Sequence, residues 1–448
     1  MELIIRYLEP CHLRAYSYRG EGNANLVISL PLARSILRFR KIELTEEAPI
    51  DGVETRVLFE WRFFMKFVSK FMGRFVTPPE VIQCHPRDFA DWDERVEILR
   101  PVHRKHKNSY NEFAIKLPDY AKLSDHLDVD ARKPTFCIEI KPKQGFMPES
   151  ERQTERCPYC IKQFHKISKR AVNKRSRYCP CDLFSGDKTR VHHAIAALIE
   201  SPQNNLIIFR EGEVVWGEGH PCDNLDKVLN EWLNNGSQKD SQQLLNELYE
   251  LIAEAMYREF PLDEKSSGSG IKSDDIIAMS RVDVNHSTSG GIQGAKEKIC
   301  NFPDGNLPEG SILGCLFRMQ QLHSSSADHV YRIYSQHSTH LNEEIVYFSE
   351  SCEYKSGENS IDFSDILILR NYLLFTTARD CSVLLTFREV DPRVAFEVPR
   401  EHVITGVDQT FVFNIGLTDL DPKPLNRIDR HRRRAIKELS VVGEFQSL

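Results

Sequence analysis

Three apolar segments of this 448-residue chain meet a charged residue at one end, and this pattern restricts the fold strongly. The segment TFCIEI is followed by Lys141, SVLLTF follows closely after Asp380, and FVFNIGLT is followed by Asp419. Short apolar runs rich in β-branched and aromatic residues are typical of buried strands. An aspartate between such strands is costly to desolvate unless it has a partner or a function. We therefore expect an α/β (α+β) protein with strands on both sides of Asp380.

The first part of the sequence predicts strands, a glycine turn and a helix. Residues 16–45 predict two strands around the turn Gly20-Glu21-Gly22-Asn23-Ala24-Asn25. Such a turn lets backbone N–H groups approach phosphate oxygens, although a plain hairpin turn has the same pattern. Arg38 on the following strand lies where a kinase keeps a cation for the α- and β-phosphates. Residues 56–73 have the spacing of an amphipathic helix that ends at Gly73.

Charge is unevenly distributed along the chain. The net charge is −6, which argues against a general nucleic-acid binder. Between Lys141 and Arg190, however, 13 basic residues face five acidic ones. This excess indicates a dedicated anion site or a solvated basic face. Lys141 and Lys143 on an extended chain would point to the same side and could hold two phosphates.

Other features of the sequence indicate where the protein is located in the cell and how its chain is organised. The first residues do not resemble a secretory signal, and no apolar run reaches ~18 residues, so we expect no membrane span. We expect a cytosolic location, with the nucleus as a second one. Residues 262–300 are rich in Ser, Gly and charge and predict a flexible insertion.

The 12 cysteines are expected to be free thiols or metal ligands. Cys157 and Cys160 form a C-x₂-C pair, and a second pair, Cys179 and Cys181, follows after eighteen intervening residues. Two such pairs favour a tetrahedral Zn²⁺ site over unligated thiols. The fourth ligand stays open between Cys181 and His165.

Six motifs occur in one order: YRGEGNANLV, EIKPKQGF, CDLFSGDK, SPQNN, TARDCS and TDLDPKPL. Together they resemble the inositol-pentakisphosphate 2-kinase family over most of residues 16–435, with 262–345 as the main gap. The resemblance implies a divergent protein-kinase-like two-lobed fold with ATP between the lobes. It implies an N-lobe at 1–118 and an enlarged C-lobe at 119–448. Within the C-lobe it implies an inositide-binding segment at about 137–210 and catalytic and metal-binding strands at about 370–435.

The resemblance also implies an activity and residue roles. The expected reaction is ATP-dependent phosphorylation of the 2-hydroxyl of inositol 1,3,4,5,6-pentakisphosphate, giving the hexakisphosphate, by a monomer that uses ATP and Mg²⁺. Asp380 is the expected base, Lys141 the residue near the transferred phosphate, and Asp419 the Mg²⁺ ligand. The expected ATP-side residues are Gly20, Gly22, Asn23, Ala24, Asn25, Arg38 and Asp119. The expected inositide contacts are Arg104, Lys143, Lys166, Asn205, Lys423, Arg427 and His431.

Two positions depart from the family pattern. Lys162 stands where relatives have a histidine, and His431 stands where a tyrosine can contact the substrate. Both residues keep a possible hydrogen-bond donor. Two alternatives remain at this stage. One is a related inositide kinase with another acceptor, and the other is a zinc-bearing nucleic-acid-binding protein that uses the basic 141–190 segment.

Overall fold

The computed structural model describes residues 3–43, 50–108, 110–219, 224–234, 236, 239–261, 300–303, 305–350, 361–406 and 408–446. The chain forms two compact units, Met1–Val129 and Asp130–Leu448, and each is described by itself. The flexible insertion predicted at 262–300 falls, apart from its last residue, outside the described residues. None of the described helices combines the length and the apolar character that a membrane crossing requires.

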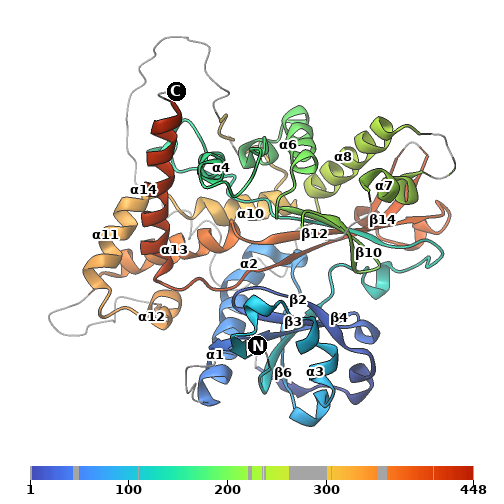
Figure 1. Ribbon diagram of the computed structural model, residues 1–448, viewed down its shortest axis with the longest axis horizontal. Coiled ribbons are helices and arrows are strands. Elements are labelled where there is room, and N and C mark those ends of the chain that lie inside the picture. Colours follow the sequence, from blue (N-terminus) through green and yellow to red (C-terminus); the bar gives the residue numbers. More distant parts are fainter. Residues whose placement is uncertain are drawn as a thin grey trace. The chain divides into compact units, whose positions relative to one another are not determined.

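The first unit is built on a six-stranded sheet with the order β1-β6-β8-β4-β3-β2 (Figure 1). Only β1 and β6 run parallel; the other neighbours are antiparallel. The predicted segment 16–45 contributes three successive strands to this sheet, β2 to β4, rather than two. The strands are β1 (Ile5–Tyr7), β2 (Ser17–Glu21), β3 (Asn25–Leu30), β4 (Ser35–Arg40), β6 (Glu80–Gln83) and β8 (Phe113–Pro118), and a separate pair joins β5 (Ile42–Glu43) to β7 (Lys107–Asn108).

Both faces of this sheet are covered by apolar side chains. Helix α1 (Ile50–Phe63) packs Val57 against Val81 on one face. On the other face, Phe89 and Trp92 of the segment that includes α3 (Trp92–Arg95) meet the ring of Phe39 at 5.8 and 5.4 Å between centroids. Neighbouring strand residues point to opposite faces, so a single strand can supply both cores.

The helix predicted at 56–73 ends where the sequence indicates. Helix α1 continues through a π-helical turn, Phe64–Val68, into α2 (Ser69–Met72). Gly73 follows with φ 49° and ψ −125°, a backbone conformation that glycine adopts far more readily than other residues. The glycine therefore ends the helix for a backbone reason.

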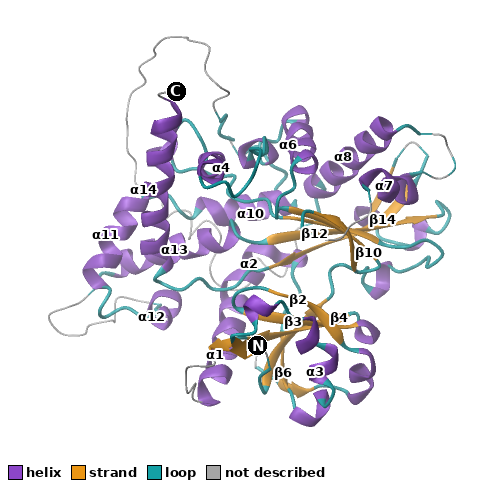
Figure 2. Cartoon of the chain, viewed as in Figure 1, coloured by secondary structure: helices purple, strands orange, loops and turns teal. Residues whose placement is uncertain are grey.

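The second unit is built on an antiparallel six-stranded sheet with the order β11-β10-β9-β12-β14-β13. Figure 2 shows these strands in orange with helices around them. Trp232 of α7 stacks on Phe136 of β9 with ring centroids 4.9 Å apart, so α7 covers one face of the sheet. The strands are β9 (Phe136–Ile140), β10 (Leu206–Arg210), β11 (Glu213–Gly217), β12 (Ser382–Val390), β13 (Val403–Thr405) and β14 (Thr410–Thr418).

The helices of the second unit form two groups around the sheet. Helix α8 packs against α6 and α7, and α13 packs against α10, α11 and α12, while α14 lies against α4 and α11 (Figure 1). The helices are α4 (Pro158–Ser168), α5 (Pro180–Leu183), α6 (Lys188–Glu200), α7 (Leu225–Leu233), α8 (Ser241–Tyr257), α10 (Ile312–Gln321), α11 (Ala327–His337), α12 (Glu343–Phe348), α13 (Phe363–Ala378) and α14 (Arg427–Gln446).

A second secondary-structure prediction is wrong. The segment before Asp380 is the helix α13, not a strand. Most of its residues are buried, so its sequence is apolar around the whole helix and shows no amphipathic period. A continuous apolar run does not distinguish a buried helix from a buried strand. After Asp380 the predicted strand is present as β12.

We predict that Gly73→Ala destabilises the first unit. An alanine at positive φ meets its own backbone, which costs about 1–2 kcal/mol. The space around Gly73 is open, so no new contact with a neighbour adds to that cost. Chemical denaturation followed by circular dichroism should show the loss, and Lys70→Ala at an exposed position of α2 should not. Equal stability of Gly73→Ala and the wild type would contradict this account.

Candidate active site

Four strands of the second sheet end side by side. Strand β12 is antiparallel to β9 and β14, and β9 is antiparallel to β10. The register aligns Ile140 with both Leu206 and Val383, and Val383 with Leu417. The residues just beyond these strand ends are therefore brought to one end of the sheet: Lys141, Asn205, Asp380 and Asp419.

Lys141 and Asp419 interact across this end of the sheet. Lys141 Nζ lies 3.8 Å from Asp419 Oδ2 and 3.6 Å from Glu139 Oε1. Burial lowers the pKa of Lys141, but the carboxylates of Glu139, Asp419 and Asp380 outweigh burial and raise it. The Asp419 side chain is 56% exposed and so remains accessible. Exposed carboxylate oxygens are ligands that suit Mg²⁺.

Asp380 is held between α13 and β12 and pairs with a lysine. Lys423 Nζ lies 3.3 Å from Asp380 Oδ2. Burial raises the pKa of Asp380, but the ammonium groups of Lys423 and Lys143 outweigh it, so the pKa lies below its usual value. Tyr347 holds Lys423 in place, because its hydroxyl accepts from Lys423 N (3.0 Å) and donates to Lys423 O (2.8 Å). Asp380 is therefore an ionised carboxylate at neutral pH.

A cavity of about 260 Å³ opens beside Asp380, and its charged lining is mostly basic. A cavity with this excess of cations favours a ligand that carries several negative charges. The acidic residues in the lining are Glu151, Asp380 and Glu438. The basic residues and histidines are Lys143, Lys162, His323, Arg379, Lys423, Arg427, His431, Arg432 and Arg434.

Helix periodicity places cations from two helices around this cavity. Arg427, His431 and Arg434 are separated by four and three residues on α14, so they share one face of that helix. Lys162 lines the cavity from α4, the helix that packs against α14. The cavity is thus bordered by two helices as well as by the end of the sheet.

Crowding among these groups shifts two of their pKa values strongly. Burial, reinforced by the charges of Arg379, Arg427 and Arg434, lowers the pKa of His431 to about 2. Arg379 Nη2 donates a hydrogen bond to His431 Nδ1 at 2.9 Å, which is consistent with a neutral ring. Burial, together with neighbouring cations, lowers the pKa of Lys162 to about 8.

Two predicted inositide contacts lie beside the cavity rather than in its lining. Lys166 Nζ bonds the side chain of Gln203. Asn205 is 1% exposed, and its Nδ2 donates to the hydroxyl of Tyr159 at 2.9 Å. Tyr159 itself lines the cavity, so Asn205 reaches the cavity through this ring.

The backbone at Lys143 differs from the extended chain that we expected. Lys143 has φ 64°, in the left-handed region. The argument that Lys141 and Lys143 point to the same side of an extended chain is therefore wrong, because the chain turns at Lys143. Both residues nevertheless reach the same end of the sheet: Lys143 lines the cavity, and Lys141 pairs with Asp419.

The basic residues of the cavity to which sequence reasoning gave no site role include Lys162, Arg379 and Arg434. Simple signals existed for each. Lys162 lies four residues before Lys166 on one helix, Arg379 directly precedes Asp380, and Arg434 continues the helical face of Arg427 and His431. From the sequence, Lys162 was recognised only as a departure from the family pattern.

The residues predicted for ATP lie in the first unit. The turn between β2 and β3 is closed by a hydrogen bond from Gly22 N to Asn25 O at 2.9 Å. Arg38 on β4 pairs with Glu60 on α1, with Nη2 3.6 Å from Oε2. Asp119 is buried, and its Oδ1 accepts from Ala121 N and lies 4.0 Å from the guanidinium of Arg19.

A buried ion cluster ties this hairpin to the segment that carries Arg104. Glu21 pairs with Lys41 at 2.6 Å and with Arg100 at 3.1 Å, and all three side chains are at most 2% exposed. Arg100 Nη2 also donates to Arg104 O at 2.9 Å. Arg104 Nη1 in turn lies 3.5 Å from Asn23 Oδ1, so Arg104 is next to the hairpin tip.

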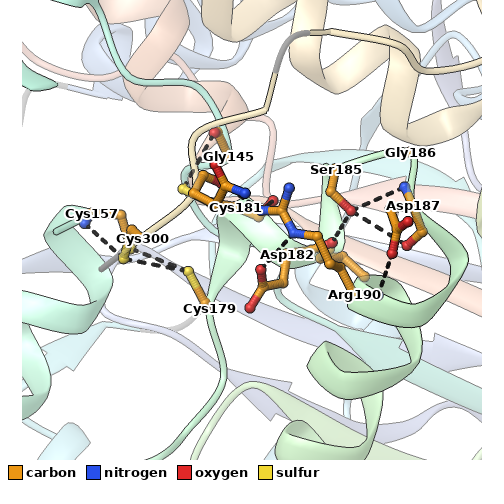
Figure 3. Close-up of polar contacts among 12 residues, drawn as sticks. Gly145, Cys157, Cys179, Cys181, Asp182, Ser185, Gly186, Asp187, Arg190 and Cys300 are labelled. Carbon is orange, nitrogen blue, oxygen red and sulfur yellow. Dashed lines mark hydrogen bonds and ion pairs between the residues drawn. The ribbon is translucent and has the colours of Figure 1, made fainter. Parts of the chain in front are cut away.

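Four cysteines of the second unit gather into one cluster: Cys157, Cys160, Cys179 and Cys300. Figure 3 labels three of them, Cys157, Cys179 and Cys300. Cys300 Sγ lies 3.6 Å from Cys160 and 3.7 Å from Cys179, and Cys157 lies 4.0 Å from Cys179. Metal–sulfur bonds of about 2.3 Å in a tetrahedron put sulfur atoms about 3.8 Å apart. The donor set therefore fits a tetrahedral thiolate metal site.

The fourth member of this cluster differs from both predicted candidates. Cys181 lies in α5, and its Sγ points to Gly145 O at 3.8 Å (Figure 3). His165 is outside the cluster as well. Cys300 takes the fourth position, from the residue that ends the predicted insertion. Local spacing could not reveal a ligand so distant in sequence.

Known proteins resemble this chain over most of its length. The model of the family described as inositol-pentakisphosphate 2-kinase matches residues 18–436. An inositol-pentakisphosphate 2-kinase of Danio rerio is 28% identical over 92% of this chain and 90% of its own. The Arabidopsis thaliana protein of the same name is 24% identical over 100% of this chain and 96% of its own.

We predict that the purified chain contains about one tightly bound metal ion, because four thiolates complete a structural site. Cys300→Ser should lose most of this metal and unfold at a lower temperature, since metal binding is coupled to folding. Cys181→Ser is the matched control and should keep its metal. Elemental analysis and thermal unfolding measure both. Metal-free wild-type protein, or equal metal loss in the two variants, would overturn the assignment.

Proposed function

Because the chain belongs to the inositol-pentakisphosphate 2-kinase family, we propose that it transfers the γ-phosphate of ATP to the 2-hydroxyl of inositol 1,3,4,5,6-pentakisphosphate. The observation that carries this proposal is the basic cavity beside an ionised Asp380. Each phosphate monoester carries about −1.5 to −2 near neutral pH, so the substrate carries roughly −8 to −10. The cavity lining has seven Lys or Arg side chains against three carboxylates, so its net charge has the sign that this substrate requires.

Asp380 has the position and charge to orient the acceptor hydroxyl and take its proton. Its low pKa makes it a weak base before transfer, so its main contribution is to position the hydroxyl until the proton leaves. Lys423 neutralises Asp380 in the absence of substrate and is also placed to meet a substrate phosphate. Lys141 pairs with Asp419 and is influenced by the charge of Asp380, so it can stabilise charge on the transferred group. Mg²⁺ bound by Asp419 would neutralise phosphate charge.

We extend the proposal to a divergent kinase-like fold, in which the first unit supplies the ATP contacts. The pairing of Arg38 with Glu60 supports this, because protein kinases use a strand cation paired with a helix glutamate for the same task, although Glu60 here also pairs with Arg40 and Arg56. The glycine hairpin and Asp119 are assigned to the ATP side, and Arg104 to inositide selection. A monomeric state and a cytosolic location with a nuclear fraction stay predictions.

We assign the metal of the cysteine cluster as Zn²⁺, with a structural role. Four thiolates and a closed coordination shell are typical of structural zinc. Cys157 and Cys160 lie at the start of α4, the helix that presents Lys162 to the cavity. The ion would thereby fix the N-terminus of that helix.

The choice of acceptor needs a direct test, since a related inositide kinase could use similar residues. An assay with labelled ATP should compare the pentakisphosphate with a panel of inositol phosphates that each lack one further phosphate. It distinguishes the proposed kinase from a related inositide kinase with another acceptor. Turnover should be greatest with the 1,3,4,5,6-pentakisphosphate. A faster reaction with another inositide would replace the acceptor and keep the kinase assignment.

We predict that Asp380→Asn lowers kcat by about 10²–10⁴-fold, the usual contribution of a general base. Asp391→Asn is a matched control, because Asp391 follows the other end of β12 and pairs with Arg393. Both variants should keep the circular dichroism spectrum of the folded wild type, although Asp380→Asn should unfold at a lower temperature because it removes the carboxylate that pairs with Lys423. Near-normal turnover of Asp380→Asn would remove Asp380 from the mechanism.

We predict that inositide affinity falls as pH rises above 8. In the ligand-free cavity the pKa of Lys162 is about 8, so this lysine loses its charge above that pH. A bound polyanion favours the charged form, so binding above pH 8 requires proton uptake. Calorimetry at pH 7, 8 and 9 should show affinity weakening by up to about tenfold per pH unit. In Lys162→Met this component of the pH dependence should disappear; an unchanged profile would contradict the role.

A further inference from the structure

The segment 141–146, which carries both Lys141 and Lys143, is fixed by surrounding side chains. The hydroxyl of Tyr178 donates to Pro142 O at 2.7 Å. A Cβ atom at Gly145 would lie 2.2 Å from the ring of Phe184, so only glycine fits this close approach. The backbone of this segment therefore has little freedom to move.

The largest set of these contacts comes from one buried amide on α10. Gln320 is 0% exposed. Its Oε1 accepts from Gly145 N at 2.9 Å and from Phe146 N at 3.0 Å, and its Nε2 donates to Lys143 O at 3.0 Å. A single side chain thus satisfies three backbone groups of the same turn.

This amide acts at the point where the backbone is least favourable. Lys143 has φ 64°, a conformation that residues other than glycine seldom adopt. Such conformations persist only where the surrounding structure enforces them. Gln320 binds the carbonyl of Lys143 itself and the two N–H groups at 145 and 146, so it closes the turn around this residue.

The position of Lys143 matters for the chemistry. Its side chain lines the cavity, and its ammonium is one of the charges that act on Asp380. If the φ angle of Lys143 changed to a negative value, its side chain would project from the backbone in a different direction. Gln320 is not part of the cavity lining, and the hydrogen bonds of its side chain go to the turn, so the amide group is placed to act on the cavity through the turn.

We infer that Gln320 is a positioning residue, which holds Lys143 in its left-handed turn and so sets where the Lys143 ammonium meets a substrate phosphate. The inference rests on the proposed function, in which Lys143 contacts the inositide. It adds a residue from α10 that lies outside the predicted inositide-binding segment 137–210.

The kinetic test uses Gln320→Met, which keeps the side-chain size and removes all three hydrogen bonds. The KM for the pentakisphosphate should rise about tenfold or more, while the KM for ATP changes less than about twofold. Gln409→Met is the matched control: Gln409 is also buried but lies beside the start of β14, at the far end of the sheet, and should leave both constants unchanged.

A double-mutant cycle separates positioning from general destabilisation. If Gln320 acts through Lys143, Gln320→Met should have no further effect on pentakisphosphate KM in a Lys143→Ala background. Full additivity of the two substitutions would overturn the inference.

Chemical labelling tests the same idea without a substrate. Acetylation of the Lys143 amine, followed by mass spectrometry, should change rate by more than about twofold in Gln320→Met and not in Gln409→Met. If the wild type failed to phosphorylate the pentakisphosphate while labelling responded in this way, the proposed function would fail and the positioning would stand. An active wild type with unchanged labelling and KM in Gln320→Met would remove the positioning alone.

Discussion

The antiparallel pairing of β12 with both β9 and β14 is the constraint on which the candidate site depends. The register runs from Ser382 opposite Thr418 to Val390 opposite Thr410. Strand β12 is buried on both faces, so a shift by one residue would exchange the side chains that pack on its two sides. It would also move Lys141, Asp380 and Asp419 out of alignment at the strand ends. The apolar core that fixes the register therefore also fixes the relative positions of the charged groups.

A cavity for a polyanion is electrostatically unfavourable when it is empty, because its cations repel one another. The structure reduces this cost with local partners and with one neutral ring. Lys423 pairs with Asp380 at 3.3 Å, and Arg434 pairs with Glu438 at 2.8 Å. His431 is neutral, because burial and the surrounding guanidinium groups lower its pKa. When a ligand with many negative charges binds, its phosphates replace these weak internal pairs, and the stronger phosphate contacts favour binding.

What the sequence predicted correctly was local. The strands ending at Lys141 and Asp419 and the helix ending at Gly73 follow from apolar runs and a glycine stop. The helix α13 was missed, because its apolar residues surround the whole helix. The left-handed turn at Lys143 was also missed, since its support comes from Gln320, 177 residues away. Cys300 could not be named as the fourth cysteine for the same reason: it lies 121 residues beyond Cys179. Motifs indicate which residues meet the ligand, whereas the residues that hold them in place come from distant segments with no spacing rule.

The difference between motif residues, which meet the ligand, and distant residues, which hold them in place, has a physical basis in how the cavity walls are supported. The wall made by α4 is fixed near its N-terminus by the cysteine cluster, which includes Cys157 and Cys160. The turn at Lys143 is fixed by a neutral amide, and the loop at Lys423 by the hydroxyl of Tyr347. None of these three supports is a carboxylate. The amide and the hydroxyl bind backbone groups of Lys143 and Lys423, so they position these lysines without occupying their ammonium groups. These supports of the cavity walls therefore leave both ammonium groups to interact with Asp380 and with the ligand.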